Sequence, residues 1–250
     1  MALNILERYG IKEVCDVTFY RIGDDGKPAE PVLYLDTLKV STVEQTAENV
    51  AARGGKGNPE LVVWDYGKEI TLNLEDAVFS SKSLALMFGT MPSELTGNDL
   101  KLKKTLSVAL LKEKTDGYYF KEHGQEFKVE GDITWYDQLG RTESEIEQGE
   151  EFVKAYGVFE VTMKEASQIE ISSDAFPDTY YVTGDTYARS ELNGEDEFLQ
   201  LVIPKAKMLS EITLTMEAEG DPSTFNMSMK VLRPEDKVMM KLIKYDIATE

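Results

Sequence analysis

The stretch from Arg53 to Asn58, RGGKGN, combines glycines with a lysine and is the first candidate for chemistry. Glycine-rich loops bind phosphate when they follow a strand, open a helix and read G-x-x-x-x-G-K-[ST]. Here Lys56 precedes Gly57 and Asn58, where the pattern requires serine or threonine, and residues 60–66 have the composition of a strand. No helix start is available for a phosphate. We therefore expect a mobile loop that leads into a hairpin, and no nucleotide cofactor.

Paired carboxylates are the second candidate, because glycoside hydrolysis needs two of them across a cleft. Candidate pairs are Asp132 with Asp137 and Asp174 with Asp178. In a chain with 46 acidic residues, such pairs cannot be distinguished from surface acids. The dipeptide Trp135-Tyr136 could stack on a sugar ring, although core or interface packing is the default for such residues. A carbohydrate-binding β-sandwich therefore stays open as an alternative.

Cys15 and His123 are the only cysteine and the only histidine in the chain. A single cysteine forms no internal disulfide, and within the predicted strand at 13–19 we expect a buried, unreactive thiol. A single histidine argues against most zinc sites and against a Ser-His-Asp triad. We therefore expect no catalytic residue, no metal and no cofactor, and a protein that is not an enzyme.

The chain is strongly acidic, with a formal charge of −19. Residues 116–151 contain 11 acids and 3 bases, and residues 165–197 contain 9 acids and 1 base. Such a surface repels nucleic acid at long range, and it forms either a solvated face or the acidic face of an assembly. No apolar run approaches the roughly 18–20 residues of a membrane span, so no membrane partner is expected. The first residues also lack a signal-peptide core.

Apolar and polar residues alternate along much of the chain, which predicts β-strands. Ile70, Leu72 and Leu74 alternate with polar residues, and the segments 212–218 and 225–231 repeat the pattern. Further strands are predicted at about 13–22, 31–39, 60–66, 101–113, 117–122, 126–130, 156–164, 178–188 and 197–208. The sequence therefore predicts an all-β fold, an antiparallel β-sandwich or barrel.

Helical signals are few. Residues 80–89 predict one short helix, which begins at a serine cap and ends at Gly89. A second helix is predicted from Thr142, where TESE fits a capping box, to as far as Tyr156. We expect one domain over residues 1–250, with a long loop at about 40–59 and an acidic insertion at about 116–155.

Two regions resemble tail tube proteins of long-tailed bacteriophages. The first region is residues 53–58 and 61–77 with the short helix after them, and the second is residues 180–189, 201–207 and 217–227. The resemblance implies a structural protein of the virion tail, made in the cytoplasm of the host bacterium. It also implies a β-sandwich whose inner sheets join in hexameric rings around a lumen. The stacked rings would be a conduit for DNA ejection, with genomic DNA and a tape-measure protein inside and terminator and baseplate proteins at the ends.

The resemblance also assigns roles to particular residues. The long loop would make the contact between rings through Arg53, Gly54, Gly55, Lys56, Gly57 and Asn58. The polar members of two alternating strands are candidates for the lumen wall: Thr71, Asn73 and Glu75, and Thr213, Thr215 and Glu217. The alternative within virions is another β-sandwich component, namely a tail terminator, a baseplate or distal tail protein, or a head decoration protein.

Overall fold

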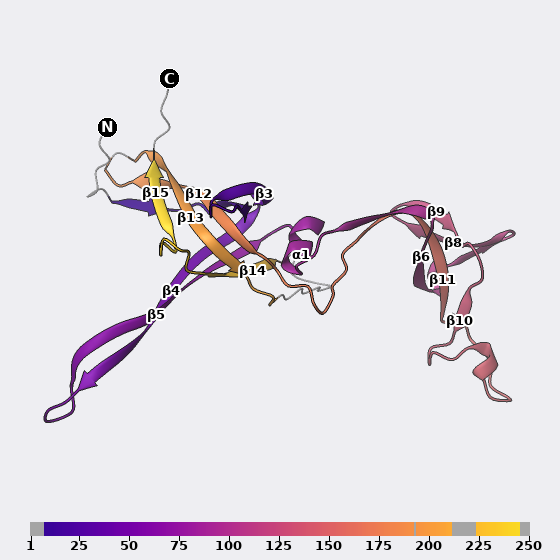
Figure 1. Cartoon of the computed structure of the whole chain (residues 1–250). Coiled ribbons are helices and arrows are strands. Elements are labelled where there is room, and N and C mark those ends of the chain that lie inside the picture. Colours follow the sequence, from indigo (N-terminus) through magenta and orange to yellow (C-terminus); the bar gives the residue numbers. More distant parts are fainter. Residues whose placement is uncertain (1–7, 193, 212–223, 246–250) are drawn as a thin grey trace, which may run out of the picture. The chain divides into compact units, whose positions relative to one another are not determined.

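The computed structural model describes residues 8–192, 194–211 and 224–245. The fold is mostly β, with 57% of residues in strands, antiparallel sheets and one short α-helix (Figure 1). The prediction of an antiparallel all-β fold is confirmed, and no sheet closes into a barrel within the described ranges. The strands are β1 (Tyr9–Ile11), β2 (Asp16–Ile22), β3 (Pro28–Leu35), β4 (Leu38–Arg53), β5 (Glu60–Asp76), β6 (Ser93–Ser107), β7 (Lys112–Lys114), β8 (Gly117–Glu122), β9 (Gln125–Lys128), β10 (Thr134–Tyr136), β11 (Tyr156–Gln168), β12 (Thr179–Ser190), β13 (Asp196–Met208), β14 (Phe225–Val231) and β15 (Lys241–Tyr245).

The chain forms two compact units, where the sequence predicted one domain. Unit 1 contains residues 1–92 and 169–250, and unit 2 contains residues 93–168. Each unit has its own sheets and its own cluster of buried apolar side chains. The expected acidic insertion at 116–155 lies inside unit 2, which also includes the two long strands β6 and β11 on either side of it.

Unit 1 is built on a nine-stranded sheet with the order β3-β2-β12-β13-β14-β5-β4, to which β1 and β15 add at β12 and β13. One face of this sheet carries the core, which includes Phe19, Leu72, Ile203, Phe225 and Met227, each 0–1% exposed. Phe19, Leu72, Phe225 and Met227 alternate with less buried residues along their strands, so period-2 patterning directs them to one face, whereas Ile203 lies in the continuous buried run 201–203 of β13.

The helix α1 (Ser81–Met87) adds Leu86 and Met87 to the core of unit 1. Its start is a capping box, in which the Ser83 amide donates to the Ser80 hydroxyl at 3.0 Å and the Ser80 amide donates to the Ser83 hydroxyl at 2.9 Å. Gly89 follows the helix with a φ of +72°, a conformation that favours glycine. The first predicted helix is confirmed.

Unit 2 contains the sheet β10-β11-β6 and the sheet β7-β8-β9. Its core is small, with Leu111, Phe120, Val129 and Phe159 buried. The second predicted helix, from Thr142, is wrong. Its capping box is present, but only the 3-10 turn η2 (Glu143–Glu145) follows, and a second 3-10 turn, η1 (Val108–Leu110), comes after β6. No apolar stripe is available to bury a helix here, and a capping box without such burial does not sustain one.

Candidate assembly surfaces

The predicted long loop at 40–59 differs most from the structure, because most of it is strand. β4 runs to Arg53 and pairs with β5 along its length, so the only connection is the short turn 54–59. β14 pairs with residues 71–76 of β5, whereas residues 60–70 pair only with β4 within the described chain. Residues 45–70, which we call the arm, therefore extend from unit 1 as a two-stranded ribbon (Figure 1). Residues 60–70 span about 35 Å at the rise of a β-strand.

The glycines at 54–57 serve the turn at the tip of the arm. Gly55 and Gly57 have φ values of +82° and +85°, and Asn58 has a φ of +52°, all in the left-handed region. The Asn58 amide donates to the Gly55 carbonyl at 3.2 Å, and the Arg53 guanidinium pairs with Glu60 on the neighbouring strand. The basic glycine-rich stretch thus reverses the chain tightly, a task that requires positive φ values.

A β-bulge near Gly67 changes which side chains share a face of the arm. Thr46 lies opposite Glu69 and Glu48 lies opposite Tyr66, so β5 has one extra residue at this point, where Gly67 has a φ of +61°. One extra residue reverses the alternation of its strand relative to its partner. Between the bulge and the sheet, the even-numbered residues of β5 face the core. Between the bulge and the tip of the arm, the even-numbered residues face the opposite side.

The bulge produces an exposed apolar face on the arm. Val50 lies opposite Trp64 and Ala52 opposite Val62, and Tyr66 shares their face. Trp64 is 55% exposed and Tyr66 is 54% exposed. Isolated two-stranded ribbons are marginally stable in water, and exposed apolar surface of this kind marks an interaction site. The sequence predicts an ordinary strand at 60–66, because alternation alone does not show that β5 extends beyond its neighbours in the sheet.

Residues 71–76 of β5 lie within the sheet, next to β14. The polar face of this part contains the first three predicted lumen residues. Thr71, Asn73 and Glu75 are half-buried, whereas Leu72 and Leu74 are buried on the core side, as the alternation predicted. In the register with β14, three further polar residues lie beside them: Asn226 opposite Glu75, Ser228 opposite Asn73, and Lys230 opposite Thr71. Lys230 also pairs with Glu69 at 2.7 Å. Thr213, Thr215 and Glu217 lie outside the described residues.

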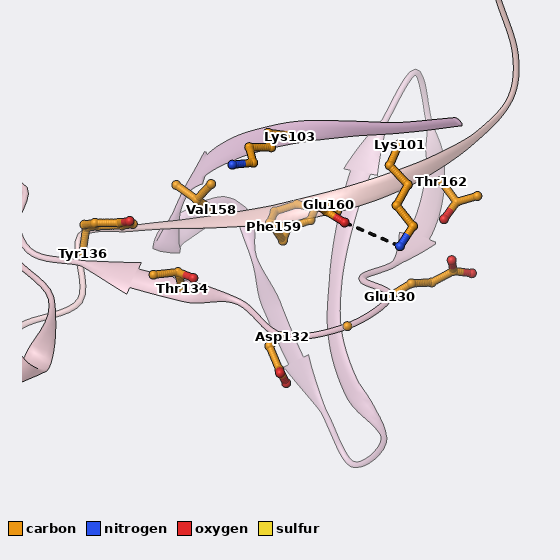
Figure 2. A pocket seen from close by; sticks show the side chains of 11 residues that line it. Lys101, Lys103, Glu130, Asp132, Thr134, Tyr136, Val158, Phe159, Glu160 and Thr162 are labelled. Atoms are coloured by element: carbon orange, nitrogen blue, oxygen red, sulfur yellow. Dashed lines mark ion pairs between the residues drawn. The ribbon is translucent and has the colours of Figure 1, made fainter. Parts of the chain in front are cut away.

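Unit 2 has a polar hollow of about 520 Å³ on its β10-β11-β6 sheet (Figure 2). Its polar lining residues are Lys101, Lys103, Glu130, Asp132, Thr134, Tyr136, Glu160 and Thr162. Lys101 pairs with Glu160 at 3.6 Å, so part of this charge is already neutralised within the sheet. The hollow lies on the side-chain face of a small sheet and is open to solvent.

The carboxylate pair Asp132 and Asp137 is not brought together across this hollow. Asp132 lines it, whereas Asp137 is buried and closes a turn. Asp137 Oδ1 accepts from the amides of Leu139 and Arg141 at 2.9 and 2.8 Å, and its Oδ2 accepts from Arg141 Nε at 2.9 Å. The backbone and side-chain hydrogen bonds from Arg141 hold the pKa of Asp137 below its usual range.

The predicted aromatic dipeptide is divided between two environments. Trp135 packs edge-on against Tyr118 at the core of unit 2, with ring centroids 5.2 Å apart. Tyr136 stacks on Tyr156 of the neighbouring strand, with ring centroids 5.3 Å apart. The two rings therefore do not form one platform for a sugar, and binding of carbohydrate stays a prediction.

Other candidate sites give no evidence of chemistry in the described part of the chain. No group of three or more His, Cys, Asp or Glu residues there could hold a metal ion. Cys15 is half-buried, and burial raises the pKa of its thiol, with further contributions from Asp185 and Asp16. Asp178 lines a hollow beside Gly89, whereas Asp174 does not. None of the described helices is long and apolar enough to span a membrane.

Comparison with known proteins agrees with the β-rich architecture. No curated protein gives a match to the chain. The model of the YomU/Tube protein family matches residues 9–244, which include all the described strands except the last residue of β15. This match covers nearly the whole chain and both units. The chain belongs to the YomU/Tube protein family, a family of phage tail tube proteins.

Proposed function

We propose that this chain is the subunit of a phage tail tube, in which hexameric rings stack into a conduit for DNA ejection. The family match over residues 9–244 supports a structural role in the virion tail. The observation that carries the proposal is the arm, which extends apolar residues on both faces of a ribbon into solvent. A subunit that works alone gains nothing from this exposure, whereas a subunit in a polymer buries it.

The arm is the proposed contact between successive rings. Its tip, Arg53 to Asn58, replaces the flexible loop that the sequence suggested, and its apolar faces add the area that a stable contact needs. The strand pairing of the arm sets its register, and docking would bury the apolar faces that leave an isolated ribbon marginally stable.

The proposed lumen wall includes Thr71, Asn73 and Glu75, with the polar residues of β14 beside them. Lys230 is a cation in this wall, but it is paired with Glu69 at 2.7 Å. The hydroxyl, amide and carboxylate groups beside it do not attract phosphate, and the chain as a whole is strongly acidic. Duplex DNA would therefore slide past such a wall, because binding to DNA depends on basic groups that release its counterions. In this proposal a tape-measure protein occupies the lumen before DNA does, terminator and baseplate proteins close the ends, and the subunit catalyses no reaction.

Electron microscopy of the purified protein at high concentration tests the proposal. The expected result is long hollow tubes with a regular axial repeat and sixfold end views. Single closed rings or monomers would contradict the tube and favour the alternative, a tail terminator, a baseplate or distal tail protein, or a head decoration protein.

A further inference from the structure

An apolar groove lies at the base of the arm in unit 1. Its volume is about 390 Å³, and its walls come from residues 11–15, β4, β13 and residues 240–242. Leu199 and Leu201 form its buried part, whereas Val43 and Leu242 are exposed at its edge. Apolar surface of this kind, open to water and next to a core, marks a docking site.

An acidic hollow of about 620 Å³ adjoins the groove and shares Lys12, Glu13, Val14 and Thr186 with it. Asp16, Asp36 and Asp185 line this hollow. Asp16 lies directly opposite Asp185 in the ladder between β2 and β12, and like charges in this position destabilise a sheet.

Lys12 and Arg189 also line the hollow, and Arg189 is paired with Asp196, but within the described chain these three carboxylates form no ion pair. Among the described residues, no lysine or arginine nitrogen lies within 4.0 Å of any of them. Their field, that of Asp16 above all, raises the pKa of the nearby Tyr34 hydroxyl. A cation placed in this hollow would relieve the repulsion between the carboxylates.

The arm has the complementary features in the same order. Trp64, Tyr66 and Val62 form its apolar strip, and Lys56 lies in the turn at its tip. Arg53 is already paired with Glu60, but the ion pairs found in the described chain do not include Lys56. The distance from the rung of Trp64 to the rung of Arg53 is about 10 Å at the rise of a strand. The arm thus has an apolar strip followed by a cation, and the receiving side has an apolar groove followed by an acidic hollow.

We propose that the groove holds the arm of a second copy of this chain, with Trp64 and its neighbours in the groove and Lys56 among Asp16, Asp36 and Asp185. This inference rests on the proposed tube function and names the receiving surface for the arm. The arm and the groove are different surfaces of one subunit, so each copy gives an arm and receives another. A heterologous contact of this kind propagates instead of closing a dimer.

Cross-linking tests the groove directly. In a Cys15→Ser background, Trp64→Cys combined with Leu242→Cys places one thiol on the arm and one on the edge of the groove. Assembled protein treated with a short bifunctional thiol reagent is expected to give a ladder of multimers on a denaturing gel. The matched control is Trp64→Cys with Val78→Cys, because Val78 is as exposed as Leu242 but lines neither hollow. It is expected to give no ladder.

A charge exchange tests the acidic hollow. Lys56→Glu alone and Asp16→Lys with Asp36→Lys are each expected to raise the concentration needed for assembly by about tenfold or more, since unmatched charges at an interface are costly. The triple variant is expected to recover most of this loss. Lys82→Glu, an equal change of charge on the exposed side of α1, is the control and should leave assembly unchanged.

The outcomes separate this inference from the tube function. Tubes that form with no ladder, or charge variants that the exchange does not rescue, overturn the groove as the receiving surface and leave the tube standing. A ladder and a charge rescue in protein that forms only short, irregular oligomers support the groove and contradict the tube.

Discussion

At the scale of single residues, Gly89 has the least room for a side chain among the described glycines. A Cβ at this site would lie 2.2 Å from the backbone carbon of Phe176 and 2.7 Å from the nitrogen of Pro177. The positive φ adds strain for any other residue. Glycine is therefore needed here for two independent reasons, conformation and close packing.

Gly89→Ala is expected to destabilise the protein by more than about 2 kcal/mol, because backbone atoms must move in addition to the strain. Gly55→Ala is the matched control: its φ is also positive, but nothing lies within 4 Å of the added Cβ, so a loss of only about 1 kcal/mol is expected. Urea unfolding measures both. Equal losses would show that packing against Phe176 contributes nothing.

The lowered pKa of Asp137 predicts that the stability of unit 2 depends on pH. The pKa of its carboxyl is lowered in the folded state, so its stabilising contribution is present above the unfolded pKa and is lost as pH falls through the folded pKa. Asp137→Asn is therefore expected to lower the melting temperature at pH 7 and to make little difference near pH 2. Asp132→Asn is the control, because Asp132 is an exposed carboxylate of the same unit. A constant difference at all pH values would contradict the prediction.

At the scale of elements, the arm matters for assembly and not for folding. Apart from Ile70, no residue of the arm belongs to the buried core of unit 1. Removing residues 50–53 together with 60–64 keeps the turn and leaves Asn49 opposite Asp65, so the remaining register is preserved. The variant is expected to keep its unfolding free energy within about 1 kcal/mol, as is usual for surface changes.

The same shortened arm is expected to abolish tubes in electron micrographs while the protein elutes as a folded subunit or ring. The full-length arm with Lys82→Glu serves as a control for handling and charge. Normal tubes from the shortened variant would show that the contact between rings lies elsewhere.

Unit 2 is expected to be dispensable for the fold of unit 1. Ser93 and Gln168 lie opposite each other in the ladder between β6 and β11, so the two connections to unit 1 begin at neighbouring points. Replacing residues 94–167 with a short glycine linker should therefore leave unit 1 folded, as judged by circular dichroism and cooperative unfolding. Loss of cooperative unfolding would mean that unit 1 depends on unit 2 for its stability.

At the scale of the whole molecule, charge is the property that the proposed conduit requires. Glu75→Lys would place a new cation on the proposed lumen wall of every subunit. Glu75 is half-buried beside Asn226, so the long side chain of lysine can still reach solvent. Particles that carry this variant are expected to assemble but to eject DNA more slowly at low ionic strength, and added salt should restore the rate.

Glu30→Lys, an equal change at an exposed position of β3, is the control for this experiment. Ejection that slows equally in both variants would point to net charge and not to the lumen wall. A map of assembled tubes with Glu75 on the outer surface would end the assignment without an ejection assay.

The sequence by itself determined the local features of this protein. Alternation predicted the strands and the direction of Leu72 and Leu74, because each side of a pleated strand repeats every second residue. A serine cap predicted the start of α1, because capping depends on residues close together in the sequence. The family resemblance was also carried by local patterns, and the family match confirms it.

Tertiary structure alone decided how far β4 and β5 extend, where the chain divides into two units and which residues meet at the groove. Residues 45–53 are exposed on both faces, so they carry no alternation that could have predicted a strand. The bulge at Gly67 moves Trp64 to the opposite face, and only the pairing with β4 reveals it. Asp16 and Asp185 are far apart in the sequence and become neighbours through the order of strands in a sheet, which short-range patterns do not encode.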